Sequence, residues 1–247
     1  MRVTIVGSGD AFCSGGRAHT CIEVAVKGHA VLVDFGASSI LAFKAQGRSF
    51  NAIDAVIISH LHGDHFGGLP YLLLDCQFSS GRKRPIPIYG PPGLRDRMMS
   101  SFKLAYPGLI GTGWNFEWPI VEVEPGDPVK IAGFDMVTHL VTHASGAPST
   151  GMRLKHGGKT FAFSGDSEWT EELIKIADGA DLYVTDCCSG QETIPGHIDW
   201  PTLKANLPRL KAKRIAATHF SPSALLKIEE MVQAGVVPTH DGLSFEF

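Results

Sequence analysis

The chain has 247 residues, a length that suits one large domain or two half-domains with a shared core. Its hydrophobic fraction of 44% and charged fraction of 19% are those of an ordinary globular protein, and the net charge of −3 provides no overall basic field for nucleic acid. We find no signal-peptide pattern and no apolar run long enough to span a membrane, so we expect no membrane association. Five cysteines without a Cys-x-x-Cys pair predict reduced thiols and a cytoplasmic location.

The N-terminal part of the chain is expected to begin a β-sheet. Apolar or alternating residues predict strands at 2–7 and 20–35, followed by a helix at 37–47. The glycine-rich segment 7–10 between the strands is compatible both with a phosphate-binding loop and with a plain turn. Asp34 ends a strand, and we expect its carboxylate to hydrogen-bond a histidine of the next loop.

The segment 53–70 contains the strongest functional signal in the chain. Residues 56–58 are apolar and β-branched, which predicts a buried strand. The loop that follows presents four potential metal ligands, namely His60, His62, Asp64 and His65. Imidazole nitrogen and carboxylate oxygen are ligands that zinc accepts. His60 and His62 alternate, so their rings are expected on one side, whereas Asp64 and His65 follow the turn and are expected to face a second ion.

The middle of the chain continues the alternation of helix and strand. We predict helices at 66–80 and 91–104 and a strand at 85–90. The basic turn 81–84 is predicted to be a solvated face rather than a phosphate contact. The segment 106–118 contains Trp114 and Phe116, and it is compatible both with an active-site lid and with a loop that packs on the surface.

The second half of the chain is again rich in strands. We predict strands at 119–124, 128–132, 134–142, 150–155, 159–164, 182–185, 214–218 and 243–247, and helices at 169–177, at 200–210 with an interruption at Pro208, and at 222–234. Strand and helix thus alternate in two halves that meet near 115–120, within a single domain that spans 1–247. Two sheets that each carry helices on one face and pack against each other predict the α/β class, as a four-layer αββα sandwich.

Potential ligands recur at the ends of the predicted strands, which should bring them to one edge of the sandwich. Two ions about 3.5 to 4 Å apart need several ligands and a bridging group. We expect His60, His62 and His143 to hold the first ion, Asp64, His65 and His219 to hold the second, and Asp166 to bridge both. Such a pair of ions lowers the pKa of a bridging water until hydroxide is available near neutral pH. Asp64 is expected to take part in catalysis as well as in metal binding.

The pattern His-x-His-x-Asp-His at 60–65 is the signature of the metallo-β-lactamase fold, and the chain resembles this superfamily over nearly its whole length. Within the superfamily it is most similar to ribonuclease Z and the related small cyclic phosphodiesterases. The stretches that carry the likeness are Gly7–Ala11, Ser59–Leu73, Ile88–Leu94, Pro148–Arg153, Ser164–Asp166 and Thr218–Ser221. The resemblance implies two divalent metal ions, zinc or else manganese or iron, and it is compatible with a homodimer.

The resembled family also carries a histidine that is not a metal ligand and lies shortly before the last ligand. His197 occupies that position here. The resemblance implies that His197 acts at the scissile phosphate, either as a general acid for the leaving group or as a donor to a phosphate oxygen. The alternative is a solvated loop histidine. Ser149 and Arg153 belong to a resembling stretch, and we expect them to bind the substrate.

One departure from the family bears on the substrate. Ribonuclease Z has a long arm that grips tRNA between the third histidine and the bridging aspartate, but here only a short segment separates His143 from Asp166. Long structured RNA is therefore not an expected partner. We predict a hydrolase that uses a metal-bridging hydroxide on a small nucleotide or cyclic phosphodiester. A neutral ester, lactone, thioester or lactam on the same metal site is the alternative. A redox di-iron protein is disfavoured, because such relatives have Glu where His62 stands.

Overall fold

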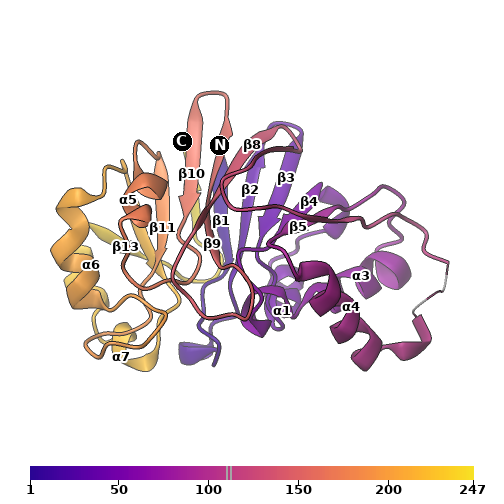
Figure 1. Cartoon of the computed structure of the whole chain (residues 1–247), viewed down its shortest axis with the longest axis horizontal. Helices are drawn as coiled ribbons and strands as arrows, with labels where there is room; N and C mark the ends of the chain where they lie inside the picture. The colour runs from indigo at the N-terminus through magenta and orange to yellow at the C-terminus, as the bar shows by residue number, and fades with distance from the viewer. Residues whose placement is uncertain (110, 112) are drawn as a thin grey trace.

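Two seven-stranded sheets form the centre of the protein. The computed structural model describes residues 1–109, 111 and 113–247 (Figure 1). The first sheet consists of β1 (Arg2–Gly7), β2 (Cys21–Val26), β3 (His29–Val33), β4 (Ala55–Ile57), β5 (Ile88–Gly90), β6 (Ile120–Glu122) and β14 (Ser244–Glu246). The second consists of β7 (Pro128–Ile131), β8 (Phe134–Leu140), β9 (Thr150–His156), β10 (Lys159–Phe163), β11 (Leu182–Asp186), β12 (Ile215–Thr218) and β13 (Val236–Pro238).

The two sheets share one arrangement of strand directions. Their orders are β14-β1-β2-β3-β4-β5-β6 and β13-β12-β11-β10-β9-β8-β7. In the first sheet, β14 to β3 pair antiparallel and β3 to β6 pair parallel. In the second sheet, β7 to β10 pair antiparallel and β10 to β13 pair parallel. Parallel neighbours end at the same edge of a sheet, so the loops after β10, β11 and β12 begin close together.

Helices cover the outer faces of both sheets. The first half contributes α1 (Ser39–Ala45), α2 (Gly63–Phe66), α3 (Leu69–Leu74) and α4 (Leu94–Ala105). The second half contributes α5 (Glu172–Ala177), α6 (Trp200–Asn206), α7 (Pro222–Leu225) and α8 (Ile228–Gln233). Shorter helical turns are η1 (Ser14–Gly16), η2 (Phe50–Ala52), η3 (Asp75–Ser79), η4 (Pro107–Leu109) and η5 (Leu207–Arg209). Figure 1 shows the purple helices beside one sheet and the orange and yellow helices beside the other, which is the predicted four-layer αββα sandwich.

Side-chain alternation along the strands distributes apolar residues between the layers. On β2, Ile22 and Val24 are buried between the two sheets, whereas Cys21 is buried beneath the helices of the first half. This is the period of two that a strand with two covered faces requires. A third apolar cluster, which includes Trp200 and Tyr183, lies under the helices of the second half. The strands that carry the site are therefore held on both faces by packed side chains.

Two predicted helices are divided in the structure, and one strand was not predicted. The segment 66–80 comprises the end of α2, then α3 and the π-helical turn η3. The new helix α3 begins at Leu69, directly after Gly67 and Gly68, and Pro70 lies in its first turn. The segment 222–234 forms two helices, α7 and α8. The strand that was not predicted is β13, which has too few residues to show the alternation of apolar and polar side chains typical of a strand. It pairs parallel with β12 at the edge of the second sheet.

The prediction that the basic turn 81–84 is a solvated face is wrong for Arg82. This side chain is 1% exposed. Its guanidinium donates hydrogen bonds to the backbone carbonyl oxygens of Phe50 (2.5 Å), Ile53 (2.9 Å) and Pro85 (2.6 Å), and also to that of Arg84 (2.8 Å). Arginine can satisfy several carbonyl groups at once because its donors lie in a planar fork. Arg82 therefore stabilises the loops at one end of the first sheet.

The glycine-rich segment 7–10 continues from β1 and pairs with other parts of the chain, because Gly7 ends β1 and Gly9 forms isolated β-bridges with His19 and Phe220. The N–H of Ser8 donates to Oδ1 of Asp241 (2.9 Å), and the N–H of Gly9 donates to the carbonyl oxygen of Ala18 (2.6 Å). These two donors are therefore already used within the protein.

The segment 106–118 packs against α4 where the structure describes it. The ring of Trp114 lies 5.8 Å from that of Phe102 and 5.4 Å from that of Trp118. Phe116 is 5% exposed. The described residues thus support surface packing rather than a lid, and positions 110 and 112 of this segment lie outside the described residues.

No described helix combines the length and the apolar composition that crossing a membrane would require. All five cysteines are free thiols, as predicted. Burial raises the pKa of the Cys76 thiol to about 12, so this thiol stays protonated at neutral pH.

Candidate metal centre

The seven predicted ligands come from the ends of strands and the loops after them. His60 and His62 follow β4, whereas Asp64 and His65 lie in α2. The other three, His143, Asp166 and His219, follow β8, β10 and β12. His219 takes a left-handed backbone conformation (φ 65°) directly after β12. Such a conformation is costly for a residue with a Cβ, and it occurs where the surroundings hold a functional residue in place.

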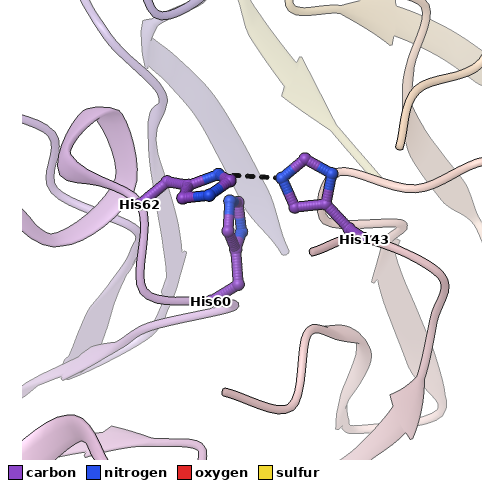
Figure 2. Close-up of side chains that lie close together, drawn as sticks. All are labelled: His60, His62 and His143. Carbon is purple, nitrogen blue, oxygen red and sulfur yellow. Dashed lines mark hydrogen bonds between the residues drawn. The ribbon is translucent and has the colours of Figure 1, made fainter. Parts of the chain in front are cut away.

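The first group of ligand-type side chains contains only histidines. One ring nitrogen of each of His60, His62 and His143 lies within 4.8 Å of the others. Nδ1 of His62 and Nε2 of His143 are 2.9 Å apart, and Figure 2 shows the three rings converging on one point. Nδ1 of His143 donates to the carbonyl oxygen of Gly196 (2.7 Å), which leaves its Nε2 facing the group. Gly196 is needed there, because a Cβ would come within 2.7 Å of this ring.

The second group combines two carboxylates with two histidines. Oδ2 of Asp64 lies 3.3 Å from Nε2 of His65 and 3.2 Å from Nε2 of His219. Oδ2 of Asp166 lies 3.1 Å from Nε2 of His65 and 3.3 Å from Nε2 of His219. The four side chains are buried and arranged around one point.

Asp166 also faces the first group. The same Oδ2 atom lies 3.8 Å from Nε2 of His60 and 4.0 Å from Nε2 of His143. One carboxylate oxygen is therefore within 4.0 Å of imidazole nitrogens from both groups. This is the position that a bridging ligand between two ions would occupy.

Three buried histidine nitrogens in this cluster have no hydrogen-bond partner among the described residues, namely Nε2 of His60, Nε2 of His65 and Nδ1 of His219. Leaving a buried polar atom unpaired costs about 1 to 3 kcal/mol. Burial lowers the pKa of His60 well below its usual value and favours the neutral ring, which is the form that binds metals. Burial alone would raise the pKa of Asp166, but His219 and His65 hold it well below its usual value. The donor set therefore fits divalent metal ions.

Asp34 holds the loop after β4 in place, as the sequence predicted. Its carboxylate is fully buried and accepts the N–H of Ser59 (2.7 Å) and the Ser59 hydroxyl (2.8 Å). It also accepts a hydrogen bond from Nδ1 of His65 (2.7 Å), which leaves Nε2 of this ring facing the second group.

His197 lies beside the two groups and is paired with a carboxylate that the sequence analysis did not single out. Its Nδ1 donates to Oδ2 of Asp186 (2.9 Å), and its ring stacks on that of His219 with centroids 5.2 Å apart. Burial lowers the pKa of His197, but the Asp186 carboxylate outweighs this and raises it above the usual value. Asp186 ends β11, which lies between β10 and β12 in the sheet. Each of these two neighbours is followed by a ligand-type residue, and this parallel arrangement was the available signal in the sequence.

A cavity of about 680 Å³ opens over this cluster. It is lined by side chains of both groups, by His197 with the preceding segment 194–196, and by Ala11 and Phe12 from the loop after β1. Such a volume suits a small ligand.

The structure does not bring Ser149 and Arg153 to the cavity. The Ser149 hydroxyl donates to the carbonyl oxygen of His143 (2.9 Å), so it braces the loop after β8. Arg153 donates to the carbonyl oxygens of Lys175 (3.1 Å) and Ile176 at the end of α5. Neither side chain lines the cavity, so substrate contact is not supported for either residue.

Comparisons with known proteins agree with this fold and cluster. The sequence model of the family described as anti-Pycsar protein Apyc1 matches residues 1–242. Ribonuclease Z from Lachnospira eligens is 30% identical over 212 residues, which cover 76% of this chain and 67% of that protein. Zinc phosphodiesterase ELAC protein 1 from Homo sapiens is 34% identical over 128 residues, which cover 51% of this chain and 34% of that protein.

The crystal structure of the metallo-β-lactamase fold protein YhfI from Bacillus subtilis has the same architecture. It matches with a TM-score of 0.81 over 99% of both chains, at 20% sequence identity. The predicted fold class is therefore confirmed. With the family match over nearly its whole length, the chain belongs to the anti-Pycsar protein Apyc1 family and has the metallo-β-lactamase fold.

Proposed function

We propose that the protein is a metal-dependent phosphodiesterase that hydrolyses a small nucleotide or cyclic phosphodiester at a centre of two divalent ions. The observation that carries the proposal is the position of Asp166 Oδ2, within 4.0 Å of imidazole nitrogens from both ligand groups. The names of related proteins support it, since the chain is similar to a ribonuclease Z and to a zinc phosphodiesterase.

The residues would divide into two sets of ligands that share a carboxylate. His60, His62 and His143 would hold one ion, whereas Asp64, His65 and His219 would hold the other, and Asp166 would bridge them. Zinc is the ion that we expect, with manganese or iron as alternatives. When bound, two such ions polarise phosphoryl oxygens and lower the pKa of water near them.

The protein's own contribution to the reaction would be orientation and proton transfer. His197 lines the cavity, and its Nδ1 is engaged by Asp186, so Nε2 is the nitrogen available to a substrate. We assign to His197 the delivery of a proton to the leaving alkoxide of the phosphodiester. Asp34 and Gly196 would act earlier, because they hold the rings of His65 and His143 in place before substrate binds.

The dimensions of the site favour a small substrate. The segment between His143 and Asp166 consists chiefly of the antiparallel strands β9 and β10, which belong to the second sheet. It therefore supplies no separate arm for gripping a folded RNA. We expect a small-molecule substrate bound in the cavity, and the proposal is compatible with a homodimer in solution.

A comparison of substrates on the metal-loaded protein tests this function. We expect hydrolysis of bis(p-nitrophenyl) phosphate and of cyclic nucleotides at rates well above those on a lactone or a cephalosporin. Efficient turnover of the lactone or the cephalosporin, with no hydrolysis of any phosphodiester, would assign the site to the neutral-ester alternative instead.

A further inference from the structure

Phe12 is an apolar side chain that is exposed at the wall of the cavity. It is 87% exposed, although most large apolar side chains of the protein are buried. It lines the same cavity as His62, His143 and Asp166. The loop that carries it, between β1 and η1, protrudes at the lower edge of the molecule in Figure 1, where it is coloured indigo.

The backbone that carries Phe12 is fixed by a buried carboxylate. Asp10 is 2% exposed, and its Oδ1 accepts the N–H groups of Phe12 (3.2 Å) and Ser14 (2.8 Å). Its Oδ2 accepts the Ser14 hydroxyl (2.8 Å), and its carbonyl oxygen accepts the N–H of Cys13 (3.1 Å). The loop is therefore an Asx-type turn whose backbone is held by hydrogen bonds to Asp10. Because the backbone is already fixed, binding of a ligand by Phe12 would cost only the rotamer freedom of its side chain.

The remaining wall of the cavity is suited to the organic part of a substrate. Phe12 and Ala11 line it together with Ile194 and Pro195, whereas the ligand-type side chains line the part where a phosphate would sit. A flat aromatic base gains free energy by stacking on an aromatic ring, and such stacking tolerates different bases because every base has a π face. An exposed phenylalanine beside a phosphate-binding centre thus matches a nucleotide better than a simple alkyl phosphodiester.

We propose that the ring of Phe12 stacks on the base of a nucleotide substrate and makes the enzyme prefer base-bearing phosphodiesters. The inference rests on the proposed function, because the phosphodiester must first be held at the metal centre. Phe12 is a specificity residue in this account and takes no part in bond cleavage.

The test compares two substrates that differ only in the base. The first is a 3′,5′-cyclic nucleotide, and it is tested both as cyclic AMP, which carries a purine base, and as cyclic UMP, which carries a pyrimidine base. The second is methyl riboside 3′,5′-cyclic phosphate, in which a methoxy group replaces the base. In Phe12→Ala we expect the ratio of kcat/KM for the nucleotide to that for the base-free analogue to fall about 5- to 100-fold. Phe12→Trp should restore the ratio, because it keeps an aromatic face.

A matched control and a binding measurement separate stacking from other roles. Phe78 is 67% exposed and does not line the cavity, so Phe78→Ala should leave the ratio at the wild-type value. Calorimetry of the metal-loaded protein should show that Phe12→Ala weakens the binding of AMP more than that of methyl riboside 5-phosphate.

The outcomes distinguish this inference from the proposed function. If wild-type protein hydrolyses the cyclic nucleotide and Phe12→Ala leaves the ratio unchanged, or slows both substrates equally, the stacking role is wrong. An equal loss on both substrates together with a change of oligomeric state would show that Phe12 contacts a second copy of the chain. If wild-type protein hydrolyses neither these cyclic phosphodiesters nor bis(p-nitrophenyl) phosphate, the proposed function itself is wrong.

Discussion

Oδ2 of Asp186 lies 2.9 Å from Nδ1 of His197 and accepts its hydrogen bond. The carboxylate is fully buried, whereas the His197 side chain is 16% exposed and lines the cavity. The N–H of Ile198 approaches the same oxygen at 3.4 Å. A buried carboxylate that orients an accessible imidazole is suited to proton transfer to a leaving group, and each of the two residues can be replaced to test that role.

Replacement of His197 tests proton transfer to the leaving group. His197→Ala should slow hydrolysis of a diester with an alkoxide leaving group by about 10²- to 10⁴-fold, the usual contribution of general acid catalysis. It should slow a p-nitrophenyl diester much less, because p-nitrophenolate leaves without a proton. Metal content should stay at the wild-type value, and elemental analysis provides that control. Equal losses on both diesters would mean that His197 stabilises phosphate charge or positions the substrate.

Replacement of Asp186 tests whether this carboxylate acts through His197. Asp186→Asn keeps the shape of the side chain but removes the charge, and we expect a loss of about 10- to 100-fold in kcat on the alkyl diester. In the His197→Ala background, the same change should add little further loss, because the residue on which it acts is gone. The measurement is a double-mutant cycle on kcat. Independent, multiplicative losses would show that Asp186 supports the site by another route, for instance through His219.

Replacement of Asp166 tests the bridge between the two ligand groups. Asp166→Ala removes the oxygen that faces both groups, so two cations would repel each other with less negative charge between them. We expect metal content to drop and phosphodiester hydrolysis to fall by orders of magnitude. Asp135→Ala, at an exposed carboxylate paired with Lys130, serves as the control and should match wild type in both measurements. Near-normal turnover in Asp166→Ala would refute the bridging role.

Arg82 provides a stability prediction that is independent of the site. Arg82→Ala removes four hydrogen bonds to backbone carbonyl oxygens, and we expect it to lower the free energy of unfolding by about 3 kcal/mol. Lys83→Ala changes an exposed neighbour and should cost less than about 0.5 kcal/mol. Urea denaturation of the two variants at equal metal loading measures both values. Equal stability of the two variants would contradict the structural role of Arg82.

The metal cluster was predictable because its signals are local. His60 to His65 are adjacent in the sequence and follow an apolar strand, and each remaining ligand-type residue also follows a strand. Strand ends gather at one edge of a sheet, so position along the chain was enough to bring these residues together.

Side-chain direction and loop closure were harder to predict. Arg153 was expected at the substrate because of its motif, but Met152 and Leu154 of the same strand point between the sheets. Alternation along β9 therefore turns Arg153 to the outer face, where α5 lies. The roles of Arg82 and Phe12 depend on which backbone groups from distant parts of the chain surround each loop. Neither the hydrophobic periodicity of the sequence nor its amino-acid composition contains that information.

The most direct test of the account is a titration of chelator-treated protein with Zn²⁺, followed by the rate of cyclic nucleotide hydrolysis at each ratio of metal to protein. Because the second ligand group completes the proposed centre, we expect the rate to rise mainly as the second equivalent binds and to reach a plateau at two ions per chain. Full activity at one equivalent, or activity that persists in the metal-free protein, would contradict the dinuclear phosphodiesterase.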